Sequence, residues 1–89
     1  MPTVSFTENI QRHVACPTGA VSGQTVREVL DNVFSGNQRA RGYVLDDRGA
    51  VRKHMNVFVD GEPITDRETL SDCVGEHSEV FIMQALSGG

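Results

Sequence analysis

The chain has 89 residues, of which 38% are hydrophobic and 22% charged, and its formal net charge is −4. A chain of this length buries one modest core, so we expect a single globular domain that is too small to enclose a large catalytic pocket. A membrane span is disfavoured because there is no run of roughly 18 apolar residues, and a secretory signal because there is no basic start followed by a long apolar run. Nucleic acid as the main partner is disfavoured by the acidic charge balance.

The first half of the chain predicts two strands and one helix. Residues 4–7 alternate apolar and polar, as in a half-buried strand, and residues 10–15 are expected as a second strand after a tight turn. Thr25 and Glu28 have the spacing of a capping box, and Gly36 suits the left-handed end of the helix that follows. That helix carries one apolar stripe at helical spacing: Val26, Val29, Leu30, Val33 and Phe34.

The second half adds further strands. Residues 38–53 are polar, with a short apolar anchor at 43–45, and no regular element is predicted there. Residues 55–59 have high β-propensity and end at Asp60-Gly61, a strong hairpin signal. A short extended piece and a loop with one helical turn, anchored by Leu70, precede the last strand at residues 79–84. This order predicts an α+β fold with the main helix packed on one face of the sheet.

The last predicted strand is apolar on both of its faces. Val80 and Ile82 share one face, and Phe81 and Met83 share the other. Because one helix covers only one face well, we expect one of these pairs on an open face, joined by Phe58. An exposed apolar patch on a small domain marks a docking site. The alternative is that the polar middle segment folds over the patch.

Charge is distributed unevenly along the chain. Residues 1–59 carry seven basic and five acidic side chains, whereas residues 60–89 carry seven acidic ones and a single basic one, Arg67. We expect this acidic third, which leads into the chain end, to steer encounters with a basic partner surface, chiefly through the association rate. A solvated face that keeps the protein soluble is the alternative.

The two cysteines, Cys16 and Cys73, are too few for a disulfide framework. Both are expected as small apolar fillers in a reducing compartment, which indicates a cytoplasmic protein. His13 with Cys16 and Cys73 with His77 could supply a tetrahedral zinc site. Their spacings do not match the commoner zinc motifs, so no metal site and no bound cofactor are predicted.

The chain ends in Ala85-Leu86-Ser87-Gly88-Gly89. Two glycines without β-carbons can thread a channel too narrow for any other residue, and an extended tail from residue 84 onward reaches about 20 Å. The α-carboxylate of Gly89 then becomes the reactive group, delivered into another protein's active site. Because a carboxylate is a poor electrophile, its use requires activation, most plausibly as an acyl-adenylate.

Three parts of the sequence together resemble the ubiquitin-like sulfur carrier proteins: the helix from Thr25, the segment 44–62 with Arg-x-His-Met-Asn-Val-Phe-Val-Asp-Gly-Glu, and the strand running into Ser87-Gly88-Gly89. This family includes the small subunit of molybdopterin synthase, the thiamine sulfur carrier and a carrier used in a thiocarboxylate route to cysteine, and the chain is most similar to the last branch. The resemblance implies a β-grasp domain over residues 1–84, with a mixed sheet and a flexible tail of residues 85–89.

The resemblance also implies a function as a sulfur carrier. By this resemblance, Gly89 is expected to be adenylated by an ATP-using enzyme similar to the one that activates ubiquitin, and then to be converted to a thiocarboxylate that donates sulfur. The implied partners are this adenylating enzyme, a sulfur donor, an acceptor synthase and a metalloprotease, so the chain is a co-substrate and not an enzyme. The partner-binding residues are expected to be Gly88, Ser87, Leu86, Met83, Phe81 and Phe58.

Two alternatives stay open beside the sulfur carrier. The chain is either a protein modifier conjugated through Gly89 to target lysines, or a plain interaction domain whose tail is irrelevant. Asp46-Asp47, adjacent in a turn, are interpreted as solvated carboxylates and not as an acid–base pair. His54 is interpreted as a solvent-facing residue at a strand entry. A ferredoxin is disfavoured because a two-iron cluster needs four cysteines.

Overall fold

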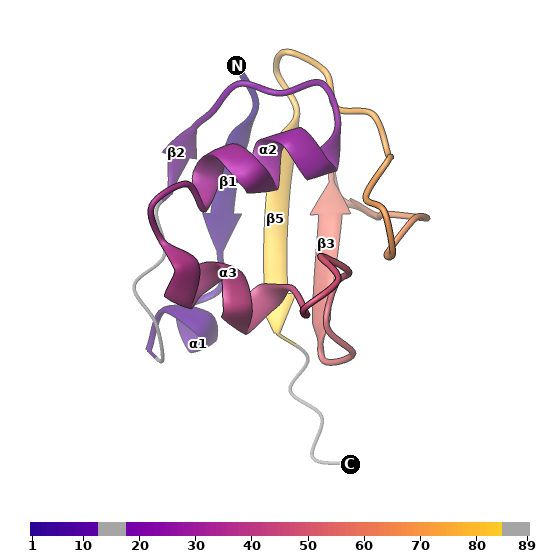
Figure 1. Cartoon of the computed structure of the whole chain (residues 1–89). Helices are drawn as coiled ribbons and strands as arrows, with labels where there is room; N and C mark the ends of the chain where they lie inside the picture. Colours follow the sequence, from indigo (N-terminus) through magenta and orange to yellow (C-terminus); the bar gives the residue numbers. More distant parts are fainter. Residues whose placement is uncertain (13–17, 85–89) are drawn as a thin grey trace.

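Residues 1–12 and 18–84 are described by the computed structural model, and they form a mixed five-stranded sheet (Figure 1). The strands are β1 (Thr3–Phe6), β2 (Gly19–Ala20), β3 (Met55–Val59), β4 (Glu62–Pro63) and β5 (Glu79–Gln84), in the spatial order β2-β1-β5-β3-β4. β1 and β5 are parallel, and the other neighbours are antiparallel. The last strand of the sequence is therefore the central strand of the sheet.

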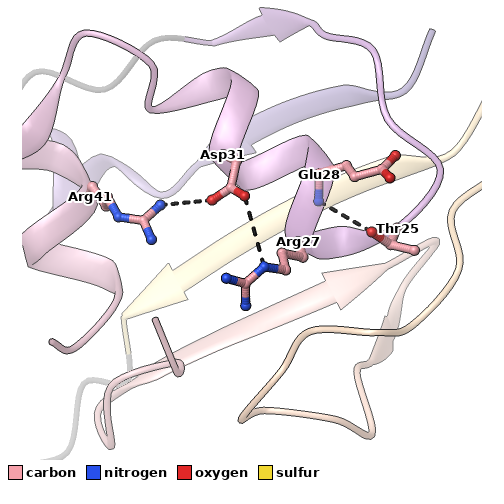
Figure 2. A network of polar contacts seen from close by, with 5 residues as sticks. All are labelled: Thr25, Arg27, Glu28, Asp31 and Arg41. Atoms are coloured by element: carbon pink, nitrogen blue, oxygen red, sulfur yellow. Dashed lines mark hydrogen bonds and ion pairs between the residues drawn. The ribbon is translucent and has the colours of Figure 1, made fainter. Parts of the chain in front are cut away.

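The main helix, α2 (Val26–Val33), lies across one face of the sheet (Figure 1). Its predicted start is confirmed, because Thr25 Oγ1 accepts a hydrogen bond from the Glu28 backbone N–H at 3.2 Å (Figure 2). The Glu28 carboxylate in turn accepts from the Gln24 N–H at 2.8 Å. The predicted stripe faces the sheet and is buried, and Gly36 takes the expected left-handed conformation, with φ +77°.

A second helix, α3 (Gln38–Val44), forms where the sequence predicted only a polar segment. Asn37 Oδ1 accepts from the Ala40 N–H at 3.1 Å, and Ala40 and Val44, one helical turn apart, are completely buried. Helix α3 lies on the same face of the sheet as α2 (Figure 1). The polar middle segment therefore packs into the core side and does not cover the opposite face.

An ion-pair network joins the two helices on their outer side (Figure 2). Asp31 of α2 is 3.9 Å from Arg27 Nε, one turn away, and 2.9 Å from Arg41 Nη1 of α3. All three side chains are substantially exposed, so we assign the network a modest stabilising effect. It links α3 to α2, and α3 in turn contacts the last strand of the sheet through Tyr43 and Gln84.

The expected strand at residues 10–15 is wrong for residues 10–12, and residues 13–15 lie outside the described part of the chain. Residues 10 and 11 belong to α1 (Glu8–Gln11), a single helical turn, and Arg12 is its C-cap in a helical conformation. The Thr7 carbonyl accepts from the N–H groups of Ile10 and Gln11 at 3.2 and 3.3 Å, and Ile10 is fully buried. Ile10 is the one apolar residue within α1, and a single apolar residue does not distinguish the periodicity of a strand from that of a helix.

The hairpin between β3 and β4 turns at Asp60-Gly61, as predicted. Both residues have positive φ, 52° and 86°, as a type I′ turn requires. The loop that follows is anchored by Leu70, which is 1% exposed. The α+β fold with its main helix on one face of the sheet is thus confirmed. In the described ranges, no helix is long and apolar enough to cross a lipid bilayer.

Candidate functional site

The open face of the sheet is the first component of the candidate site. Along β5, Val80 and Ile82 are completely buried under the helices, whereas Phe81 is 38% exposed. Met83, two residues further on the same face, is half-buried. The sequence left open which pair of β5 residues faces outward, and the structure assigns Phe81 and Met83 to the open face.

Strand register assembles a row of side chains across this face. Phe58 of β3 lies directly opposite Phe81, Ser5 of β1 lies on the other side of Phe81, and Pro63 of β4 pairs with Phe58. Phe58, Phe81 and Met83 line one shallow groove together with polar residues of β1. The three apolar residues predicted to dock a partner are therefore brought together. We call Phe58, Phe81 and Met83 the open-face cluster.

The root of the C-terminal tail is the second component. Gln84, the last residue of β5, pairs opposite Met55, the first residue of β3. Its side-chain oxygen accepts hydrogen bonds from the Tyr43 hydroxyl of α3 at 3.2 Å and from Asn9 Nδ2 of α1 at 3.4 Å. Two helices are thereby tied to the point where the chain leaves the sheet. The predicted tail residues Leu86, Ser87, Gly88 and Gly89 lie outside the described residues.

Arg67 supports this end of the sheet from a distant loop. Its guanidinium donates to the carbonyl oxygens of Met55 at 2.6 Å and Arg52 at 2.8 Å, and to Asn56 Oδ1 at 3.3 Å. In the sequence, Arg67 stands out only as the single basic residue of the acidic C-terminal third. No local pattern could have identified it, because its three partners lie 11 to 15 positions away along the chain.

Three acidic residues of the C-terminal third are used to hold loops. The Asp60 carboxylate accepts from the Ser78 hydroxyl and the Glu79 N–H at 3.0 and 2.9 Å. Hydrogen bonds from the Ser71 and Thr69 hydroxyls hold the pKa of Asp66 far below its ordinary value of 3.8. The backbone N–H groups of Thr65 and Asp66 lower the pKa of Asp72 in the same way. The other four acidic side chains are exposed: Glu62, Glu68, Glu76 and Glu79.

Part of the acidic third lies away from the tail, contrary to the expectation from the sequence. The turns 60–62 and 75–79 lie at the Glu79 end of β5, where Asp60 bonds to Glu79, and the chain leaves the sheet at the Gln84 end (Figure 1). The six residues of β5 separate the two ends by about 17 Å. The loop between the two turns runs back along β3 to the Gln84 end, where Arg67 bonds to Met55 and Arg52. Proximity in sequence was misleading for the two turns, because an extended strand intervenes between them and residue 84.

The remaining titratable candidates are placed as follows. The carboxylate of Asp46 accepts from the backbone N–H groups of Arg48 and Ala50, which lower its pKa, so it serves as a turn-holding residue. His54 is exposed at the entry to β3, as predicted.

Cys73 is exposed and free, so its prediction as a core filler is wrong; the adjacent Val74 fills the core instead. His13 and Cys16 lie outside the described ranges, within which no group of three or more metal-ligating side chains occurs.

Comparison with known proteins finds similarity in the fold and not in the sequence. No protein-family model matches the sequence, and no curated protein matches it significantly. A chain of the BexX/CysO complex from Amycolatopsis orientalis matches with a TM-score of 0.80 at 23% identity, over 100% of both chains. SAMP1 from Haloferax volcanii matches with a TM-score of 0.77 at 22% identity, over 99% of this chain and 98% of that one. CysO from Mycobacterium tuberculosis gives 0.79 at 19% identity, over 97% and 100%.

The fold is the ubiquitin-like β-grasp. At these identities the likeness establishes the fold, and it extends over essentially the whole chain. The resemblance drawn from the sequence is therefore confirmed at the level of structure. In this β-grasp domain the open-face cluster lies on the central strands, and the chain end follows directly from the central strand β5.

Proposed function

We propose that this protein is a sulfur carrier whose C-terminal Gly89 is adenylated and converted to a thiocarboxylate for the biosynthesis of a small molecule. The observation that carries the proposal is the combination of a whole-length β-grasp match with a Ser87-Gly88-Gly89 end. That end begins a few residues after the central strand, so a partner that holds the sheet is positioned to receive it. The chain acts as a co-substrate, and its partners supply the catalysis.

The chemistry proceeds at the α-carboxyl group of Gly89. A carboxylate oxygen attacks the α-phosphorus of ATP, and pyrophosphate leaves. A hydrosulfide-level sulfur nucleophile, delivered by the sulfur donor, then attacks the acyl carbon, and AMP leaves with the bonding electron pair. The resulting thiocarboxylate presents a sulfur nucleophile to the acceptor synthase. Where the product stays linked to Gly89 through its acyl carbon, a metalloprotease releases it and restores the carboxylate.

The two parts of the site have separate tasks in this proposal. Phe58, Phe81 and Met83 dock the adenylating enzyme, while Leu86, Ser87 and Gly88 lie in the channel that leads to its ATP. One structural neighbour, CysO, is named in a complex with a second protein, BexX, which supports a partner-dependent role for this fold. We place these steps in the cytoplasm, and the exposed, free Cys73 thiol is consistent with a reducing compartment.

Intact-protein mass spectrometry tests the proposal. The full chain is incubated with MgATP, sulfide and the adenylating enzyme of its host, and we expect a mass gain equal to the exchange of one oxygen for sulfur. A matched variant that ends at Gly88 retains the whole sheet and removes only the reactive residue, so it should gain nothing. Absence of the exchange in the full chain, or an equal gain in the shortened one, refutes the proposal.

A second function, conjugation to other proteins, is favoured by two neighbours named small archaeal modifier protein 1. This chain would then form an isopeptide bond between Gly89 and a target lysine. No Lys or Arg follows Arg67, so trypsin leaves the long branch 68–89 on a target; cleavage after Glu79 leaves the shorter branch 80–89. Finding that branch on lysines of host proteins supports the modifier function, and finding only free thiocarboxylate supports the carrier.

A further inference from the structure

The two ends of the central strand differ in charge. Three elements meet the Gln84 end of β5: helix α1, which donates from Asn9; helix α3, which donates from Tyr43; and the turn into β3, whose Met55 pairs with Gln84. Across residues 8–12, 38–44 and 52–56 there are five basic side chains and one acidic one. The loop of Arg67, which bonds to Met55 and Arg52, adds Asp66 and Glu68 to this end. At the other end, the turns 60–62 and 75–79 carry four acidic side chains and no Lys or Arg. The tail therefore leaves from the more basic end of the molecule.

Three of the basic residues belong to the elements that meet at Gln84, and none of them makes an ion pair with another residue of the described ranges. Arg52 lines a hollow with Tyr43 and Gln84, and its Nε donates only to the neutral carbonyl of Gly42, at 2.7 Å. Arg39 lies one helical turn before Tyr43 on the same side of α3. Lys53 comes two residues before Met55. Arg39 and Lys53 are exposed and make no ion pair with other described residues.

We propose that Arg39, Arg52 and Lys53 form a basic collar around the tail root, and that the protein surface which receives the tail is acidic around its entrance. This inference rests on the proposed function, because it requires that residues 85–89 enter a partner. The acidic turns 60–62 and 75–79 lie about 17 Å from Gln84, beyond a Debye length of about 8 Å at physiological ionic strength, so they do not cancel the collar. They disfavour approach of their own end of the molecule to an acidic surface, so the charge difference orients the approaching carrier with its tail first.

Two charge reversals of equal size test the collar. In one, Arg39→Glu and Lys53→Glu reverse the collar. In the other, the loop reversal, Glu62→Lys and Glu76→Lys reverse exposed residues of the acidic turns at the Glu79 end. Arg52 is left unchanged because its hydrogen bond to Gly42 supports the fold. The readout is ATP–pyrophosphate exchange by the host's adenylating enzyme, measured against carrier concentration at low and high salt.

We expect the collar reversal to raise the KM for the carrier about tenfold at low salt with kcat unchanged, and the difference to shrink at high salt. The loop reversal should change KM less than about twofold. An unchanged KM for the collar reversal, or a larger effect of the loop reversal, overturns the inference while the proposed function stands. No exchange with the unaltered protein refutes the proposed function, and the inference falls with it.

Discussion

Phe81 and Val80 are neighbours on β5 with side chains on opposite faces of the sheet, so truncating each one separates docking from stability. Phe81 is 38% exposed and Val80 is fully buried. We expect Phe81→Ala to weaken association with the adenylating enzyme and to leave the free energy of unfolding nearly unchanged. Val80→Ala should do the reverse.

The exposed part of Phe81 sets the size of the docking effect. A Phe side chain presents about 200 Å², so 38% exposure leaves about 75 Å² for a partner to cover. At about 25 cal/mol per Å² this contributes about 2 kcal/mol, or about 25-fold in KM if KM follows the dissociation constant. Val80→Ala removes two buried methyl groups and leaves a small cavity, which lowers the free energy of unfolding by about 2 kcal/mol.

Both variants are measured in the same two assays. ATP–pyrophosphate exchange against carrier concentration gives KM, and urea unfolding gives the free energy of unfolding. A KM for Phe81→Ala within twofold of the unaltered chain, with the fold intact, would show that the open face does not dock the enzyme. An equal loss of affinity in Val80→Ala, below its unfolding transition, would show that the effect comes from a general loosening of the sheet.

Three further predictions concern the stability of the domain, each read from thermal or urea unfolding. Thr25→Ala removes the acceptor that caps α2 and should cost about 1 kcal/mol; no loss would mean that Glu28 alone suffices. Gly23→Ala places a Cβ 2.8 Å from Val29 N and should cost about 2 kcal/mol, whereas Gly42→Ala, with open space around it, should stabilise by about 0.5 kcal/mol. Because the folded-state pKa of Asp66 is depressed, its contribution to the free energy of unfolding is complete above about pH 4 and is lost as the pH falls below the ordinary pKa of 3.8. Asp66→Asn should therefore flatten the loss of stability in acid. An unchanged acid profile would contradict the assignment.

The sequence was sufficient for elements with a dense local signal. The cap at Thr25 with its apolar stripe, the Asp60-Gly61 turn and the two-sided last strand all form where they were predicted. In each case the residues that decide the structure are within a few positions of one another. The reactivity of Gly89 stays a prediction, because it depends on residue type and position alone and Gly89 lies outside the described residues.

Features that depend on tertiary packing could not be predicted. Helix α3 is anchored by only two buried residues, Ala40 and Val44. Their burial depends on the completed core, so the local sequence alone does not predict the helix. Arg67 acts on groups that are distant in sequence, so it looked like an ordinary surface charge. The acidic turns 60–62 and 75–79 were expected near the tail because they precede it in sequence, although β5 separates them from Gln84 by its whole length.

The position of β5 has a consequence for how the protein is made. β5 supplies the pairing partner of both β1 and β3, yet it is the last strand in the order of the described chain. During synthesis the earlier strands emerge without the strand that joins them, and such long-range pairing forms slowly. The sheet therefore closes only after β5 has emerged. A chain truncated within β5 loses the strand that holds β1 and β3 together, so an incomplete copy also lacks the assembled open-face cluster.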